Sequence, residues 1–307
     1  MVPTRPVDGR CAGLGPRRSR RRPADLLEWA MRIAGWALLA ALLFAVGCQP
    51  EPNQIQPPKV AKKVVSLSPS LTEIVTVYGR TDILVGRTAS CNYPPYVGKV
   101  QVVMSGIKPD YEKVASVKPD LVVYDAEILS EADMAKFKEL GIPTFGLKAK
   151  DIPEFERELF RLGSLVGTES RTSDYVDKIE AARALARVQR PKAPPTVAII
   201  LPGSGSEHMV SGTASFLAKV FEECGAKVLG PESDRFEPLN AETLVAQDPD
   251  FVFVAGEPTL FLQDQRFKSL KAVSGKHVFG LNPDVALRKG SRVDTLIKSV
   301  SNLLTGR

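Results

Sequence analysis

The chain has 307 residues, of which 44% are hydrophobic and 25% are charged, and this composition is that of an ordinary globular protein. It excludes a disordered or fibrous protein, and the length is sufficient for two lobes with separate cores. The formal net charge of +6 comes mainly from residues 1–47, which hold eight Arg against three acidic residues and leave 33 Lys and Arg against 32 acidic residues from Cys48 onward. The charge therefore does not indicate a nucleic-acid-binding surface.

The first 47 residues have the three parts of an export signal. Arginines at 17–22 precede an apolar run of 14 residues at 33–46, which is short for a membrane span of about 20 residues. The run ends in Ala45-Val46-Gly47-Cys48, which resembles a lipobox, whose last residue takes a lipid. We predict a signal peptide at 1–47, with Met31 as the suspected start, and lipidation at Cys48.

A plain N-terminal membrane anchor is the alternative to cleavage and lipidation. In either case we expect the protein at the outer face of the cytoplasmic membrane, in the periplasm or at the cell surface. Residues 48–63 are rich in Pro and Gln and lack apolar periodicity, so we predict a flexible tether there. Two cysteines remain in the folded part, Cys91 and Cys224, and we expect them as free buried thiols in different lobes.

From Val64 onward, short apolar runs alternate with amphipathic stretches. Strands are predicted at 64–67, 121–124 and 144–147, with helices at about 71–78 and 130–140. This alternation indicates βαβ units and a largely parallel sheet.

A long polar-amphipathic segment interrupts this pattern at about 170–189. Its apolar residues recur at spacings of three and four, which predicts one helix of about 20 residues, roughly 30 Å long; they are Tyr175, Ile179, Ala182 and Leu185. Strands at 196–201, 251–254 and 278–279 and a helix at about 291–304 then resume the alternation.

These elements predict an α/β fold of two lobes, each with a central, mostly parallel sheet, linked by one long helix. The predicted boundaries are 64–167 for the N-terminal lobe, 168–192 for the connecting helix and 193–307 for the C-terminal lobe. An internal repeat supports two lobes, because the pattern of 112–122 recurs at 242–252 as Glu, a helix-like segment, a Pro-Asp turn and an apolar run. Two unrelated α/β units are the alternative.

In several stretches the sequence resembles the solute-binding proteins for cobalamin, ferric siderophores and haem, whose lobes are joined by a single helix. The resemblance covers about 64–304 and is carried by VSLSPSLTE at 65–73, NYPP at 92–95, the segment 106–112, both Pro-Asp turns and the central helix. It implies a monomeric, non-enzymatic receptor of an ABC importer, which takes a cobalamin-like or iron-chelate ligand to a permease with ATPase subunits. It implies neither a cofactor nor a nucleic-acid partner.

The resemblance also implies roles for individual residues. Glu112 and Glu242, one on each lobe, match the carboxylates that dock this family onto permease arginines, with ordinary exposed helix-start glutamates as the alternative. The ligand cleft is expected at the carboxyl ends of the strands, lined by Ser68, Tyr93 and Phe236. Both aromatic rings are alternatively part of the lobe cores.

The last cleft segment carries two further candidates, Arg288 and Arg292. An arginine fork suits ligand carboxylates or phosphates, although surface arginines without a ligand role are equally compatible with the pattern. Two departures weaken a cobalamin assignment: the stretch 104–107 has no Trp, and Val285-Ala286 stands where an aromatic pair is expected.

Other chemistries have little support in the sequence. The segment 203–208 lacks the Lys-Ser/Thr ending of a P-loop and any nucleophile elbow, so we predict a flexible cleft loop. His208 and His277 are the only histidines and no cysteine pair has metal-ligand spacing, so we predict no metal site and no catalytic residues. An enzyme of the tetrapyrrole chelatase type and a ligand sensor without transport remain as alternatives.

Overall fold

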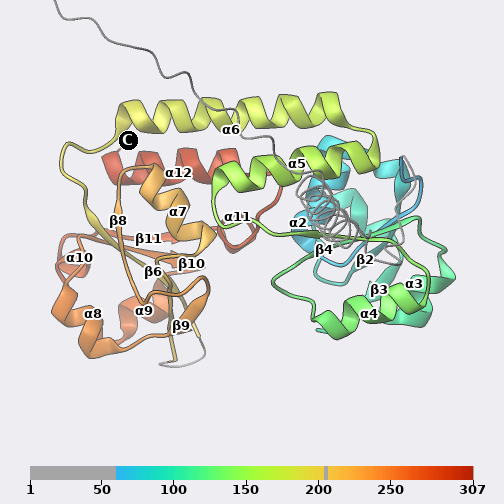
Figure 1. Ribbon diagram of the computed structural model, residues 1–307. Coiled ribbons are helices and arrows are strands. Elements are labelled where there is room, and N and C mark those ends of the chain that lie inside the picture. Colours follow the sequence, from blue (N-terminus) through green and yellow to red (C-terminus); the bar gives the residue numbers. More distant parts are fainter. Residues whose placement is uncertain (1–59, 204–206, 307) are drawn as a thin grey trace, which may run out of the picture. The chain divides into compact units, whose positions relative to one another are not determined.

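The computed structural model describes residues 60–203 and 207–306, all of which belong to one compact unit (Figure 1). The predicted signal peptide, the lipid site Cys48 and most of the predicted tether lie outside the described residues. So do residues 204–206 of the predicted cleft loop.

The N-terminal lobe is built on a parallel five-stranded sheet with the strand order β3-β2-β1-β4-β5. Its strands are β1 (Val64–Ser66), β2 (Leu84–Thr88), β3 (Val102–Met104), β4 (Leu121–Asp125) and β5 (Thr144–Leu147). Its helices are α2 (Pro69–Glu73), which a π-helical turn continues over Ile74–Gly79, α3 (Tyr111–Ser116), α4 (Glu131–Glu139) and α5 (Ile152–Val166), with short 3₁₀ turns at Thr81–Ile83 and Pro95–Lys99.

The C-terminal lobe is built on a six-stranded sheet with the order β11-β10-β6-β7-β9, in which β8 also pairs with β6. Strands β6, β8, β10 and β11 are parallel, whereas β7 runs antiparallel to both neighbours. The strands are β6 (Thr196–Leu201), β7 (Met209–Ser211), β8 (Lys227–Leu229), β9 (Phe236–Pro238), β10 (Phe251–Ala255) and β11 (Val278–Leu281). The helices are α7 (Phe216–Glu223), α8 (Ala241–Gln247), α9 (Thr259–Gln263), α10 (Lys271–Ser274), α11 (Pro283–Ala286) and α12 (Val293–Thr305), with a 3₁₀ turn at Gln265–Phe267.

The central strands form because their apolar runs can be buried on both faces, as parallel sheets require. Strands β1, β4, β6 and β10 are almost entirely buried, and each was predicted from its run of Val, Ile, Leu or Phe. Helix α5 is absent from the predicted elements, although it is strongly amphipathic. It begins where the Asp151 carboxylate accepts the backbone N–H of Glu154 at 2.8 Å, and it ends at Gly167, whose φ of +70° favours glycine.

The predicted connecting helix is α6 (Glu169–Gln189), which packs against α5, α7 and α12 (Figure 1). Its buried residues Tyr175, Ile179, Ala182 and Ala186 recur at spacings of three and four. The prediction placed Leu185 on this face, but its side chain is 47% exposed. The apolar stripe therefore continues through the smaller Ala186, because position 186 follows the helical repeat from Ala182 and position 185 lies beside it.

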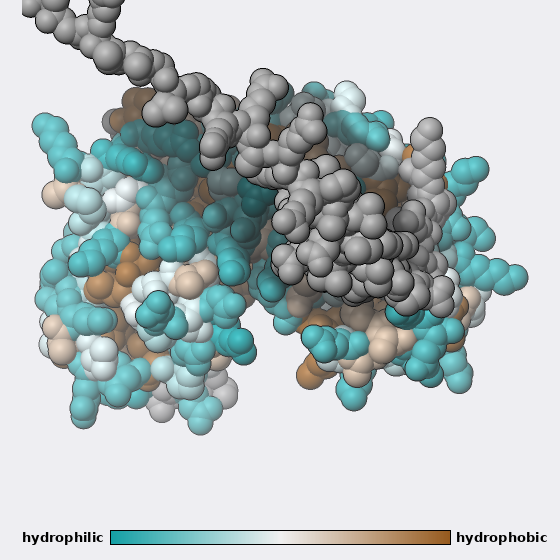
Figure 2. Space-filling view, in the orientation of Figure 1, coloured by the Kyte–Doolittle hydropathy of each residue, from teal (hydrophilic) through white to brown (hydrophobic). Residues whose placement is uncertain are grey.

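The cores lie between the sheets and their helices, and the face seen in Figure 2 is mostly covered by hydrophilic residues with smaller apolar patches. Cys91 and Cys224 are both buried and free, as predicted. Burial raises the pKa of Cys224 to about 12, which keeps its thiol protonated. None of the described helices is long and apolar enough to cross a membrane.

Candidate functional site

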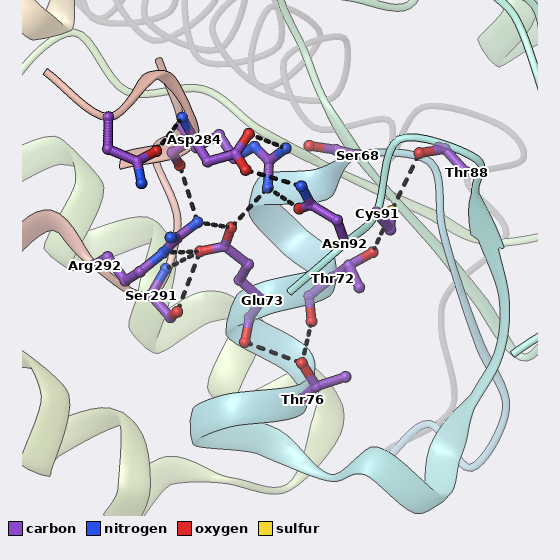
Figure 3. A network of polar contacts seen from close by, with 12 residues as sticks. Ser68, Thr72, Glu73, Thr76, Thr88, Cys91, Asn92, Asp284, Ser291 and Arg292 are labelled. Carbon is purple, nitrogen blue, oxygen red and sulfur yellow. Dashed lines mark hydrogen bonds and ion pairs between the residues drawn. The ribbon is translucent and has the colours of Figure 1, made fainter. Parts of the chain in front are cut away.

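The buried carboxylate of Glu73 lies where the two lobes meet (Figure 3). Glu73 is the last residue of α2 and is only 1% exposed. Its Oε1 accepts a hydrogen bond from Nη1 of Arg288 at 3.1 Å and another from Nη2 of Arg292 at 2.6 Å. Its Oε2 accepts Nε of Arg292 at 3.2 Å and both the backbone N–H and the hydroxyl of Ser291, at 3.3 and 3.2 Å. One N-terminal carboxylate thus receives five donors from a single C-terminal segment.

Asn92 adds further hydrogen bonds between the N-terminal lobe and the segment that contains Arg288. Its side-chain NH₂ donates to Oδ2 of Asp284 at 2.8 Å, and its carbonyl oxygen accepts Nη1 of Arg288 at 2.7 Å. Arg288 closes the ring through Asp284, with Nη2 and Oδ1 2.6 Å apart. The guanidinium of Arg292 lies over the ring of Tyr93, 4.3 Å from its centroid, which is a cation–π geometry.

A second ion pair joins the lobes beside the first. Nζ of Lys289 lies 2.7 Å from the Glu127 carboxylate and 4.0 Å from that of Asp125, which ends β4. Burial raises the pKa of Asp125, although the charge of Lys289 acts in the opposite direction. Lys289 is itself only 7% exposed, whereas the side chain of its partner Glu127 is 51% exposed, so water reaches this pair from the Glu127 side.

The connecting helix α6 also contacts the C-terminal segment 288–293, through Tyr175. The hydroxyl of Tyr175, on α6, donates to the Gly290 carbonyl at 2.7 Å and accepts the Val293 N–H at 3.1 Å. The Tyr175 ring stacks on Tyr78 with centroids 4.1 Å apart, and burial raises the Tyr175 pKa well above its ordinary value. A Cβ at Gly290 would lie 2.7 Å from Oε2 of Glu73, so only glycine lets the segment approach this closely.

Two of the four predicted ligand-lining residues belong to this contact, namely Tyr93 and Arg288. Ser68 is fully buried before α2, and its hydroxyl has no hydrogen-bond partner among the described residues. Phe236 lies elsewhere: it begins β9 and packs half-buried against the large core cluster. Ligand contact by these four residues stays a prediction.

Glu73 lies within the matched segment 65–73, but neither its sequence context nor the resemblance predicts a role for it. Its partners lie more than 200 residues away, so local pattern could not name them. The local pattern indicates the opposite of burial, because Leu71 and Val75 define one face of the helix and Glu73 lies on the other, where a charged side chain is ordinarily exposed.

Glu112 and Glu242 occupy equivalent positions in the two lobes. Each lies in the first turn of a short helix, α3 or α8, whose N-cap side chain accepts the backbone N–H three residues on: Asp110 from Lys113 at 3.1 Å and Asn240 from Thr243 at 2.9 Å. Both glutamates are exposed, and neither carboxylate has a hydrogen bond or ion pair with another residue in the described segments.

The two copies also agree further along the repeat. The Asp120 carboxylate accepts the N–H of Lys63 at 3.0 Å before β1, and the Asp250 carboxylate accepts the N–H of Thr196 at 2.7 Å at the start of β6. The hydroxyl of Thr196 also donates to Asp250 at 2.7 Å, and this bond, together with that from the Thr196 N–H, holds the pKa of Asp250 at about 2. Lys118 and Asp248, six residues after the two glutamates, both have positive φ, +48° and +41°. The internal repeat is therefore a structural repeat.

The model of the family described as "Periplasmic binding protein" matches residues 64–285. The chain belongs to this periplasmic binding protein family. It is similar to YvrC of Bacillus subtilis, an uncharacterized ABC transporter substrate-binding lipoprotein, with 27% identity over 258 residues that cover 80% of this chain and 79% of YvrC. A vitamin B12-binding protein of Salmonella choleraesuis is 25% identical over 248 residues, which cover 80% of this chain and 91% of that protein.

Solved structures agree with the fold. The vitamin B12 binding protein BtuF of Vibrio cholerae has a TM-score of 0.71 at 21% identity, over 80% of this chain and 98% of BtuF. The periplasmic heme-binding protein BhuT, in complex with two hemes, gives the same TM-score, identity and coverage. The predicted two-lobed α/β fold and the predicted family are thereby confirmed. Membership in a family of periplasmic binding proteins places this chain outside the cytoplasm and favours a binding protein over the chelatase alternative.

Proposed function

We propose that this chain is the lipid-anchored receptor of an ABC importer and delivers a corrinoid-like or iron-chelate ligand to its permease. The relatives support the ligand range, since they include proteins named for vitamin B12 and for heme. YvrC, named an ABC transporter lipoprotein, supports both the transporter and the anchor.

The observation that carries this proposal is the matched pair Glu112 and Glu242. A two-lobed receptor that docks onto a two-fold symmetric permease needs one equivalent contact on each lobe. Equivalent helices present the two carboxylates, which are exposed and without partners in the described chain, so they are available to cations of another protein. Within this chain, the interaction available to either carboxylate is the one with the dipole of its own short helix, which contributes typically about 0.3–1 kcal/mol at an exposed site.

The ligand site lies, in this proposal, along the carboxyl ends of the strands where the lobes meet. Tyr93 and Arg288 are at this border, and open α/β sheets place their ligands at such edges. The ligand then bridges both lobes, and the bound form is the one that the permease accepts. ATP is consumed by the transporter and not by this chain.

The test is uptake in the source organism combined with binding by the purified protein. Deletion of the gene is expected to abolish uptake of one labelled ligand among cyanocobalamin, haem and ferric siderophores, and calorimetric titration should give one-to-one binding of the same ligand. A ligand sensor would bind equally well while uptake stayed unchanged, so that result would replace the importer role.

The lipid anchor has its own test. Substitution of Cys48→Ala removes the thiol that the lipid would modify, and we expect the protein to move from the membrane fraction to the soluble exported fraction. Metabolic labelling with a palmitate analogue should mark the parent protein and not the variant. Membrane retention of the variant would favour the uncleaved N-terminal anchor instead.

A further inference from the structure

Exposed aliphatic side chains gather in the segments that follow strands β3, β4, β10 and β11. They are Ile107, Ile128, Leu260, Leu262 and Leu287, with exposed fractions between 41% and 83%. Ten large hydrophobic residues are exposed in the described part of the chain, and half of them lie in these few segments. Isolated exposed apolar residues are ordinary, but these five all follow the carboxyl ends of strands, which is the edge where open α/β sheets place their ligands.

Two of these side chains flank the contact between the lobes. Ile128 follows Glu127 directly, and Leu287 lies two residues before Lys289, the partner of Glu127 at 2.7 Å. Leu260 and Leu262 lie on α9, which follows β10, the sheet neighbour of β11. The carboxyl edges of both sheets therefore offer aliphatic surface next to the Glu127–Lys289 pair.

The cations in the segment after β11 are already neutralised by acids. Arg288 is paired with Glu73 and Asp284, Arg292 with Glu73, and Lys289 with Glu127. Their side chains are 13%, 19% and 9% exposed. An anionic ligand would have to draw Arg288 or Arg292 away from Glu73, and the buried carboxylate would then lose the charges that balance it, which is strongly unfavourable.

We infer that this edge selects an electrically neutral ligand with a broad apolar surface, and that Arg288 and Arg292 position the lobes instead of binding ligand carboxylates. This inference rests on the proposed receptor function and narrows its ligand class. A macrocycle bordered by methyl and uncharged amide groups fits the aliphatic surface. A porphyrin dicarboxylate or an anionic iron chelate does not, because the cations that would receive its charge are engaged.

The test compares four probes with the full exported protein by calorimetric titration: cyanocobalamin and a neutral ferric trihydroxamate against haem and ferric citrate. We expect one neutral probe to bind at least ~10-fold more tightly than either anionic probe. Ile128→Asn and Leu260→Asn should each weaken its binding by about tenfold, since an aliphatic side chain loses its apolar contact. Leu185→Asn is the matched control: Leu185 is 47% exposed on α6, away from the strand ends, and its substitution should leave binding unchanged.

The outcomes separate this inference from the function on which it rests. Tighter binding of haem or ferric citrate, with a loss upon Arg288→Gln that exceeds any loss for the neutral probes, would overturn the neutral-ligand inference and leave the receptor function intact. Equal loss for all probes upon Arg288→Gln, together with a lower Tm, would support the positioning role. If none of the four probes binds to folded protein and uptake is unchanged in the deletion strain, both the neutral-ligand inference and the receptor function would be overturned.

Discussion

Glu73 and Glu156 are carboxylates that face arginines in two regions of the molecule. Glu73 is buried and both of its oxygens accept hydrogen bonds, whereas Glu156 is only partly buried and its Oε1 has no hydrogen-bond partner in the described chain. Glu73, between the lobes, accepts five hydrogen bonds from Arg288, Ser291 and Arg292. Glu156, in the layer of α5, α6 and α7, has the nearest arginine nitrogen, Nη1 of Arg183, at 3.6 Å. Arg183 also forms ion pairs with Glu180 and Glu223. Burial, together with the charge of Glu180, raises the pKa of Glu156 to about 7.

The difference shows that the lobes are joined in two physically distinct ways. At the strand ends, one carboxylate accepts hydrogen bonds from five donors, three of them on the guanidiniums of Arg288 and Arg292. In the helical layer, Glu156 and Glu180 share the single guanidinium of Arg183, and the contact is improved when one of the two carboxyl groups takes up a proton. Each contact can therefore be tested by removing a charge, with opposite expected signs.

The largest effect is expected for Glu73→Gln. The substitution leaves two largely buried guanidiniums without their common counter-charge, which costs about 3–5 kcal/mol and corresponds to a fall in Tm of roughly 10 °C. Thermal unfolding followed by circular dichroism measures it. Glu139→Gln, at an exposed pair with Lys136, is the control and should change Tm by less than about 2 °C. Equal Tm values for both variants would show that the Glu73 contact does not hold the lobes.

A smaller loss of stability is expected for Gly290→Ala, which tests how closely the segment 288–293 approaches Glu73. The new Cβ would lie 2.7 Å from the Glu73 carboxylate, so the segment must move, at a cost of about 1–3 kcal/mol. Gly106→Ala is matched to it, because a Cβ there meets nothing within 4 Å, and it should stay within about 0.5 kcal/mol of the parent. Chemical unfolding of the two variants measures the difference, and a parent-like Gly290→Ala protein would contradict a tight approach.

Glu156→Gln should stabilise the protein slightly in alkaline solution. Between about pH 4.5 and 7 the folded protein keeps a proton on Glu156 that the unfolded chain has released, so this residue makes stability fall as pH rises across that window. The neutral amide removes that dependence, and at pH 8 we expect a Tm about 2 °C above the parent, with a flatter pH profile. A lower Tm at pH 8 would mean that the attraction to Arg183 outweighs burial and the repulsion by Glu180.

Local pattern was sufficient for much of the fold. The buried strands β1, β4, β6 and β10 each consist of one apolar run, and the stripe of α6 follows a helical period. Five strands were not predicted, namely β2, β3, β7, β8 and β9. All but β2 have only three residues, and Pro238 interrupts the strand pattern of β9. Strands β7 and β9 illustrate the reason. They exist because β6 and its neighbours provide the pairing edge.

In the candidate site, too, some residues could be named from the sequence and others could not. Glu112 and Glu242 were named because of the resemblance to the solute-binding family, and the repeat within the sequence marks their equivalent positions. The partners of Glu73 could not, since ion pairs over more than 200 residues depend on how the lobes are placed and not on neighbouring residues. Arg288 was predicted as a site residue from its residue type, and only the structure showed that Glu73 and Asp284 engage it.

The exposed pair Glu112 and Glu242 completes the comparison, because these carboxylates have no partner to lose. Reversal of both charges, Glu112→Arg with Glu242→Arg, should leave Tm within about 2 °C of the parent and ligand affinity unchanged, since both side chains are exposed and apart from the contact between the lobes. Uptake, however, should fall at least ~10-fold, because two like charges would then face the permease cations. Glu131→Arg with Glu139→Arg, two exposed sites on α4, controls for charge alone. Full uptake by the Glu112 and Glu242 double variant would remove the docking role and leave these residues as ordinary helix-start glutamates.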